Sequence, residues 1–293
     1  MDAVATSGGA RAVRLGLFAL AVVGALIGLQ HLLFQTDVLM EDVRAYYDAG
    51  ARLNAGQDLY VQPAGTDEAA FYRYPPLLAI VFRPLALLPY PWAAAIWGTL
   101  MVAAFTATLF IIGLRSSTWL ALGILAMPIL WSLTIGQAQV LVTLLLVVGA
   151  PWAVALAGYL KLLPFLVGLY WLGRREWPAL GRMVAWTLVI GLAQLIVEPR
   201  GTVAYLAFPG LSQVGDVHNL SLFAISPYLW VGFLVAGTAL TLYTARSKWG
   251  WPVAVAFSVL ATPRLLTYQL SSLLAALRPP SSASATARTE QPS

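Results

Sequence analysis

The sequence of 293 residues contains no cysteine and only two histidines. Disulfides, thiolate metal sites and cysteine nucleophiles are therefore excluded. His31 and His218 lie far apart in sequence, which argues against a zinc centre. Charged residues make up only 10% of the chain, against roughly a quarter in an ordinary soluble domain. The net charge of +5 comes from few acids and scattered arginines rather than from a basic stripe, so nucleic-acid binding has little support.

The sequence contains long apolar runs, and hydrophobic residues make up 60% of the chain. Runs such as 15–34, 92–114 and 222–244 reach the roughly 20 residues that a helix needs to cross a bilayer. They lack the alternation that is typical of membrane barrel strands. The expected fold class is therefore an all-α integral membrane protein, a polytopic helical bundle.

The apolar runs predict about nine or ten membrane-spanning helices. They lie near 15–35, 75–90, 92–114, 117–134, 137–150, 152–172, 179–197, 222–244 and 250–268. The runs at 75–90 and 137–150 are short, so tilted, kinked or re-entrant helices are all open there. The tail from Pro279 is rich in Ser, Thr, Ala and Pro and is expected to be disordered. Residues 1–278 are then one membrane-embedded domain, and residues 279–293 are its tail.

Basic residues predict how these helices are oriented. Arg11 and Arg14 precede the first apolar run, and no small-residue cleavage site follows it. We therefore expect a retained first helix with a cytoplasmic N-terminus. Alternate counting then places the basic clusters at 174–182 and 246–248 inside, as the positive-inside rule requires. Loops 36–75 and 198–221 fall on the external face, where together they would form one site.

The first of these loops is the most polar part of the chain. Seven of the 12 acidic residues fall within it: Asp37, Glu41, Asp42, Asp48, Asp58, Asp67 and Glu68. Carboxylates gathered in one long loop beside a bilayer indicate chemistry or recognition there. Solvated loops are also acidic without any catalytic reason, so charge alone leaves both interpretations open.

Residues 41–54 have helical spacing, with Asp42, Tyr46, Ala49 and Leu53 on one face. The opposite face carries a possible ion-pair ladder of Arg44, Asp48 and Arg52. Burial of Asp42 among aromatic and aliphatic side chains would raise its pKa and suit it to general-base catalysis. The alternative is that Asp42 only caps the helix, because aspartate is favoured at helix starts.

Aromatic and amide side chains near the predicted site could bind a sugar. Tyr46, Tyr47 and Tyr74 could stack on sugar rings, or they could form an interfacial aromatic belt. Gln137 could donate a hydrogen bond to a sugar hydroxyl, or it could join two helices. The sequence leaves both alternatives open at each position.

Several short blocks occur in an order that resembles glycosyltransferase family 87. The first blocks are Asp42–Gly50, Gly56–Tyr60, Phe71–Leu77 and Pro84–Pro89, followed by Trp97. The later blocks are Gly136–Gln139, Lys161–Pro164, Arg174–Trp177 and His218–Ser221. Each block is short, and their common order over residues 36–225 carries the resemblance.

The resemblance implies a membrane enzyme of the GT-C class that takes mannose or a related sugar from a polyprenyl-phosphate donor. The acceptor would be a glycolipid or glycan of a bacterial cell envelope, at the outer face of the plasma membrane. Asp42 would be the general base of an inverting single displacement, with Asp37 as the alternative. His218 and Asn219 match the family's Asn-x-Ser element in an outer loop and are candidates for sugar or acceptor binding. This mechanism requires neither a metal ion nor another cofactor.

The leaving phosphate of such a donor needs cations. Lys161 precedes Pro164 in an apolar run, where a helix break could expose the ammonium group to a cavity. Arg83 also lies among apolar residues, although snorkelling to the lipid headgroups would explain it equally well. Arg73 and Arg264 are candidates for external phosphate contacts.

Other functions remain open from the sequence. Members of the resembled family usually continue with further spans beyond the point where this sequence stops, so a shortened active member, an inactive relative and a truncated product are alternatives. A transporter or lipid-handling protein could use Lys161 and Arg83 along a path for anions. Transporters usually bind substrates near the membrane midplane, so the long acidic loop favours the enzyme. A non-catalytic scaffold for envelope synthesis is a third interpretation.

Overall fold

The computed structural model describes residues 2–34, 39–61, 71–207 and 218–278, and the side chains of residues 2–10, 31, 32 and 34 are not described. These ranges contain helices and no strands. The predicted tail, residues 279–293, and Asp37 lie outside them. The all-α class is confirmed.

Four described helices are long and apolar enough to cross a membrane. They are α1 (Asp2–Phe34), α4 (Tyr90–Ile112), α10 (Trp177–Val197) and α13 (Pro227–Thr244). A fifth span is possible if α5 (Ser116–Ile124) and α6 (Ala126–Thr134), which meet at a bend of 66°, are taken together. The chain is therefore a multi-pass membrane protein.

The structure has fewer membrane-length helices than the nine or ten that the apolar runs predict. The other runs form shorter helices: α3 (Pro76–Leu85), α7 (Gln139–Val148), α8 (Pro151–Leu160) and α14 (Gly250–Leu260). A ten-residue helix is about 15 Å long, half the hydrocarbon core. Proline and glycine explain the breaks, because Gly149 has a left-handed φ of 61° at the end of α7 and Pro151 begins α8.

The remaining elements connect these helices. After α8 the chain continues through a 3₁₀ segment, η1 (Leu163–Val167), and α9 (Gly168–Arg174). The short helices α11 (Pro199–Ala207) and α12 (Leu222–Ile225) precede α13. A second 3₁₀ segment, η2 (Thr267–Leu277), follows α14.

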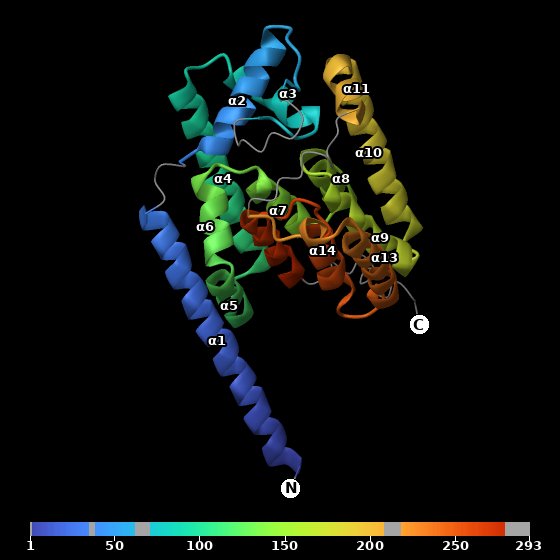
Figure 1. Cartoon of the computed structure of the whole chain (residues 1–293). Helices are drawn as coiled ribbons and strands as arrows, with labels where there is room; N and C mark the ends of the chain where they lie inside the picture. Colours follow the sequence, from blue (N-terminus) through green and yellow to red (C-terminus); the bar gives the residue numbers. More distant parts are fainter. Residues whose placement is uncertain (1, 35–38, 62–70, 208–217, 279–293) are drawn as a thin grey trace, which may run out of the picture.

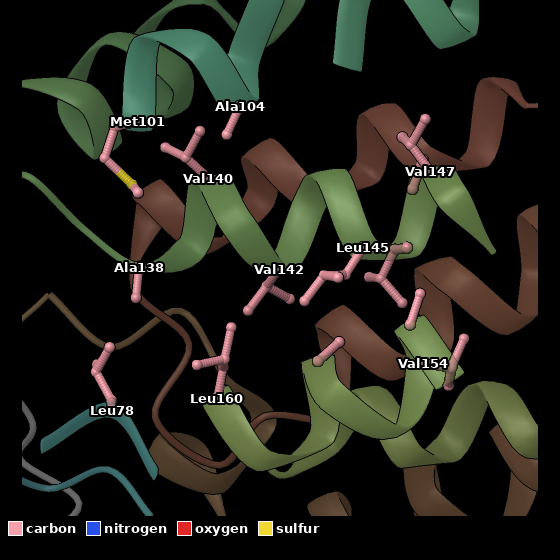
Figure 2. Close-up of a cluster of buried hydrophobic side chains, with 14 of the residues drawn as sticks. Leu78, Met101, Ala104, Ala138, Val140, Val142, Leu145, Val147, Val154 and Leu160 are labelled. Carbon is pink, nitrogen blue, oxygen red and sulfur yellow. The ribbon is translucent and has the colours of Figure 1, made fainter. Parts of the chain in front are cut away.

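The core is built around α7 (Figure 2). Val140, Val142 and Val147 of α7 are buried. Met101 of α4 lies on one side of α7, and Val154 of α8 lies on the other. The 3₁₀ segment η2 also packs against α7. The central position of α7 matters for function because the loop that precedes it, 135–138, carries Gln137.

Helix α2 (Glu41–Asn54) matches the range that its spacing predicts. Tyr46, Ala49 and Leu53 are buried, whereas Arg44 is exposed and forms an ion pair with Asp48 at 3.2 Å. Figure 1 shows α2, α3 and α11 together at one end of the molecule, and the N-terminus of α1 points toward the other end. The polar helix α2 is thus held at the end opposite the basic N-terminal region.

Candidate functional site

The start of α2 is fixed to the end of α6 by main-chain hydrogen bonds. The amide of Met40 donates to the carbonyl of Thr134 at 2.8 Å, and the amide of Asp42 donates to the carbonyl of Ile135 at 3.1 Å. Gly136 makes this approach possible, because its φ is 67° and a Cβ atom there would lie 2.2 Å from Cγ2 of Val43. Asp42 is therefore placed beside the loop that leads into α7.

Asp42, Gln137, Tyr46 and Tyr74 form one hydrogen-bond network. Nε2 of Gln137 donates to Oδ2 of Asp42 and also to the Tyr74 hydroxyl, the second at 3.0 Å. The Tyr46 hydroxyl donates to Oε1 of Gln137 at 2.7 Å. Gln137 is fully buried, so its amide joins three segments that are distant in sequence. These side chains, predicted separately, meet at one site.

Asp42 does not act as the helix cap that the sequence left open. The residue that caps α2 is Met40, and no side chain makes a capping hydrogen bond. The carboxylate instead accepts its hydrogen bond from Gln137, and it is partly buried. Its position on the inner face of α2 agrees with the predicted spacing.

Two cations face this carboxylate from later segments. Lys161 follows directly after α8, and its Nζ lies 5.2 Å from the ring centre of Tyr74 and 4.7 Å from that of Tyr268. This Nζ is buried and donates no hydrogen bond within the part of the chain that the structure describes. Lys161 and Arg264 both lie close enough to Asp42 to act on its charge. A buried ammonium without a hydrogen-bond acceptor is costly and is suited to an anionic ligand.

The pKa of Asp42 is raised from 3.8 to about 6. Burial is the largest cause, because it disfavours the charged carboxylate. The positive charges of Lys161 and Arg264 and the hydrogen bond from Gln137 oppose this shift, and the neighbouring Glu41 adds to it. A carboxylate with a pKa near 6 is ionised at neutral pH and is a stronger base than an ordinary aspartate.

Asn219 holds the segment that carries Arg264. Its Nδ2 donates to the carbonyl of Pro263 at 3.0 Å, and its Oδ1 accepts from the amide of Leu265 at 3.0 Å. The hydroxyl of Ser221 donates to the same Pro263 carbonyl at 2.5 Å. The side chains of the Asn-Leu-Ser element thus form hydrogen bonds with the main chain on both sides of Arg264. These bonds fix the position of Arg264 in the site.

Arg83 and Tyr47, two other predicted residues, make their hydrogen bonds outside this network. Nε of Arg83 donates to Oδ1 of Asn54 at 3.0 Å, which ties α3 to the end of α2. The Tyr47 hydroxyl donates to the carbonyl of Leu88 at 2.7 Å, so this ring supports the loop after α3. His218 is exposed and has a left-handed φ of 57°. Arg73 is partly buried between Tyr72 and Tyr74 in sequence.

Tyr268 is a member of the site that the sequence did not single out. Its ring lies under the Lys161 ammonium and next to the charge of Asp42. It lies four positions after Arg264, and this short spacing was the only signal in the sequence that pointed to it. Within the described ranges, no group of three or more His, Cys, Asp or Glu residues could hold a metal ion.

Comparison with known proteins identifies the family. The model of glycosyltransferase family 87 matches residues 71–280. The chain belongs to glycosyltransferase family 87. The matched range includes Tyr74, Gln137, Lys161 and Arg264, and Asp42 lies upstream of it. In this family 87 chain, the two cations of the site, Lys161 and Arg264, therefore lie within the region that the family model matches.

Two curated relatives carry the same description, polyprenol-phosphate-mannose-dependent alpha-(1-2)-phosphatidylinositol pentamannoside mannosyltransferase. The protein from Mycolicibacterium smegmatis is 34% identical over 144 residues, which cover 43% of this chain and 35% of the relative. The protein from Mycobacterium tuberculosis is 27% identical over 183 residues, which cover 53% of this chain and 42% of the relative. The family 87 chain thus matches less than half the length of these relatives. No solved structure matches it significantly.

Proposed function

We propose that this family 87 protein transfers mannose from a polyprenyl-phosphate donor to a hydroxyl group of a cell-envelope glycolipid or glycan. The family assignment supports glycosyl transfer. The names of both relatives support mannose as the sugar, polyprenol phosphate as its carrier and a phosphatidylinositol mannoside as the class of acceptor. The site around Asp42 supplies the groups that this reaction needs.

Asp42 is the general base of the proposed reaction. Its carboxylate takes the proton of the acceptor hydroxyl as that oxygen attacks the anomeric carbon of mannose. The bond from the anomeric carbon to the phosphate oxygen breaks, and polyprenyl phosphate leaves with the bonding electron pair. Attack opposite the leaving group inverts the anomeric centre. Gln137 holds the carboxylate in place and leaves its other oxygen, Oδ1, for the hydroxyl.

Lys161 and Arg264 bind the donor phosphate. The single observation that carries this assignment is the Lys161 ammonium, buried against two tyrosine rings and lacking a hydrogen-bond acceptor within the described residues. A phosphate oxygen would satisfy it. Positive charge placed where the leaving oxygens gain negative charge lowers the barrier to bond cleavage. The base and the cations then lie on opposite sides of the reacting carbon.

The site is proposed to face the outside of a bacterial plasma membrane. α2 lies at the end of the molecule opposite the N-terminus of α1 (Figure 1). Arg11 and Arg14 on α1 favour the cytoplasmic side. A lipid-linked donor and a lipid-linked acceptor could then meet in the outer leaflet. Cysteine labelling of residues 41–60 from the outside would test this orientation.

Transfer of radiolabelled mannose from polyprenyl-phosphate-mannose into glycolipid, measured with purified protein in lipid, tests the proposal. Asp42→Asn keeps the size of the side chain but removes the base, so transfer should fall by about 10²–10⁴-fold. Asp48→Asn is the matched control, because Asp48 lies on the outer face of the same helix and pairs with Arg44. Unchanged transfer by Asp42→Asn would reject this role for Asp42.

A further inference from the structure

A cavity lies away from the Asp42 network, between the loop after α2 and the corner that joins α10 to α11. Its volume is about 460 Å³. Polar and aromatic side chains from both segments line it: Gln57, Asp58, Tyr60, Glu198 and Arg200. The helices α2 and α11, which contribute lining residues, lie at the same end of the molecule as α3 (Figure 1).

The walls of this cavity are held in place by defined contacts. Oε1 of Glu198 accepts a hydrogen bond from the amide of Gly201 at 3.0 Å, which fixes the carboxylate at the start of α11. The Tyr60 hydroxyl donates to the carbonyl of Tyr74 at 2.8 Å. The Tyr60 ring also packs against Tyr205 of α11, with 5.9 Å between the ring centres. The cavity is therefore a built feature of the fold.

The chemistry of the lining favours a neutral ligand with several hydroxyl groups. Asp58 and Glu198 provide carboxylates that accept hydrogen bonds from hydroxyls, and Arg200 and Gln57 provide donors. Two carboxylates against one guanidinium group give the cavity a negative charge, which disfavours a phosphate. The Arg200 guanidinium in the same lining disfavours a bound metal ion, because the two positive charges repel each other. The hydroxyl groups of a hexose can donate hydrogen bonds to these carboxylates and accept hydrogen bonds from Arg200 and Gln57.

Tyrosine contacts connect this cavity to the Asp42 network. Tyr60 lies 6.1 Å from Tyr72, Tyr72 lies 5.7 Å from Tyr74, and Tyr74 lies 5.4 Å from Tyr46, measured between ring centres. The cavity is thus within a few sugar residues of the proposed base. A few sugar residues are long enough to span the separation between this cavity and Asp42.

We infer that the cavity is an acceptor subsite that binds a non-reacting hexose of a mannose-containing glycan. The inference rests on the proposed function, since it assigns the acceptor side of the same reaction. The subsite would select acceptors that already carry several sugars. Shorter acceptors would still reach Asp42 but would lack this contact.

Equilibrium dialysis of tritiated manno-oligosaccharides against the purified full chain, without any donor, tests the subsite. Ala204 lines the cavity, so Ala204→Trp should fill it and weaken binding at least tenfold. Asp58→Asn should weaken binding by about tenfold through the loss of a charged acceptor. Val203→Trp is the matched control, because Val203 is 60% exposed on the same helix and does not line the cavity.

The outcomes separate this inference from the proposed reaction. Binding that is lost in Ala204→Trp and kept in Val203→Trp supports the subsite, whatever the result of the transfer assay. Failure of transfer with this binding intact would reject the reaction alone. The subsite is overturned if the wild type does not bind mannotriose, if Ala204→Trp binds it equally well, or if inorganic phosphate displaces it.

Discussion

The side-chain amide of Asn219 donates a hydrogen bond to the carbonyl oxygen of Pro263, 3.0 Å away. The carbonyl of the same side chain accepts from the amide of Leu265. Both peptide groups that flank Arg264 are therefore held by one residue from the segment before α12. Because the charge of Arg264 acts on Asp42, Asn219 positions a cation of the site without touching the carboxylate itself.

Asn219→Ala should raise the KM for the polyprenyl-phosphate donor by about tenfold, since each lost hydrogen bond contributes about 1 kcal/mol and Arg264 loses its fixed position. The acceptor KM should change little. Asn219→Asp keeps an oxygen acceptor for Leu265 and should rescue part of the donor affinity. Leu220→Ala is the control in the same loop. A loss of kcat with unchanged donor KM would contradict this positioning role.

The pH dependence of transfer should follow the ionisation of Asp42. Its pKa of about 6, raised by burial, means that the base is ionised above pH 6 and protonated below it. The rate should therefore fall about tenfold for each pH unit below 6. Lys161→Met should shift the profile to higher pH, because the lysine charge lowers the pKa of Asp42. A shift to lower pH would contradict the proposed contact.

The same pKa has a consequence for stability. The folded-state pKa of Asp42 lies above the value of 3.8 for a free side chain, so ionisation costs more in the folded protein. The free energy of unfolding should fall as pH rises from about 4 to about 6. Asp42→Asn removes this dependence and should unfold at the same or a higher temperature at pH 7. Thermal unfolding in detergent measures this, and a lower midpoint would contradict it.

Replacement of Lys161 should separate binding of the donor from catalysis by the base. Lys161→Met keeps the length and apolar stem but removes the ammonium, so the donor KM should rise about 10–100-fold. Lys248→Met is the control, because that ammonium lies over the ring of Trp249 outside the site. Titration of the donor with each variant makes the measurement. An unchanged donor KM would remove Lys161 from phosphate binding.

Gly136→Ala should disrupt the junction between α2 and the loop before α7. Gly136 and Gly56 both have φ of 67°, but a Cβ atom meets Val43 only at Gly136 and meets nothing within 4 Å at Gly56. The conformational cost of about 1–2 kcal/mol is shared by both alanine variants. Gly136→Ala should therefore be the less stable of the two, and it should also lose activity. Equal thermal midpoints would show that the close approach is not needed.

The local parts of this structure could be predicted from the sequence. The 3.6-residue period over 41–54 gave both the bounds of α2 and the buried face with Asp42 and Tyr46. Local spacing says nothing about Gln137, which lies 95 residues from Asp42. That contact depends on tertiary packing, and only the resemblance to a family linked the two blocks.

The number of membrane-length helices was harder to predict. Apolar runs show which residues avoid water, but they do not show where a helix breaks. The break after Leu160, at Lys161, divides one predicted span into α8, η1 and α9. The role of Arg83 could not be predicted from the sequence either. Its sequence neighbours are apolar, but its side chain donates a hydrogen bond to Asn54.

The site gathers groups from both halves of the chain, with Asp42 near its beginning and Arg264 and Tyr268 in the segment around the start of η2. During synthesis, the ribosome releases the carboxylate more than two hundred residues before these partners. A nascent chain therefore carries the proposed base long before Arg264, one of the two proposed phosphate contacts, has been synthesised. In the proposed reaction, donor lipid is not consumed until the segment that carries Arg264 and Tyr268 has folded against α2.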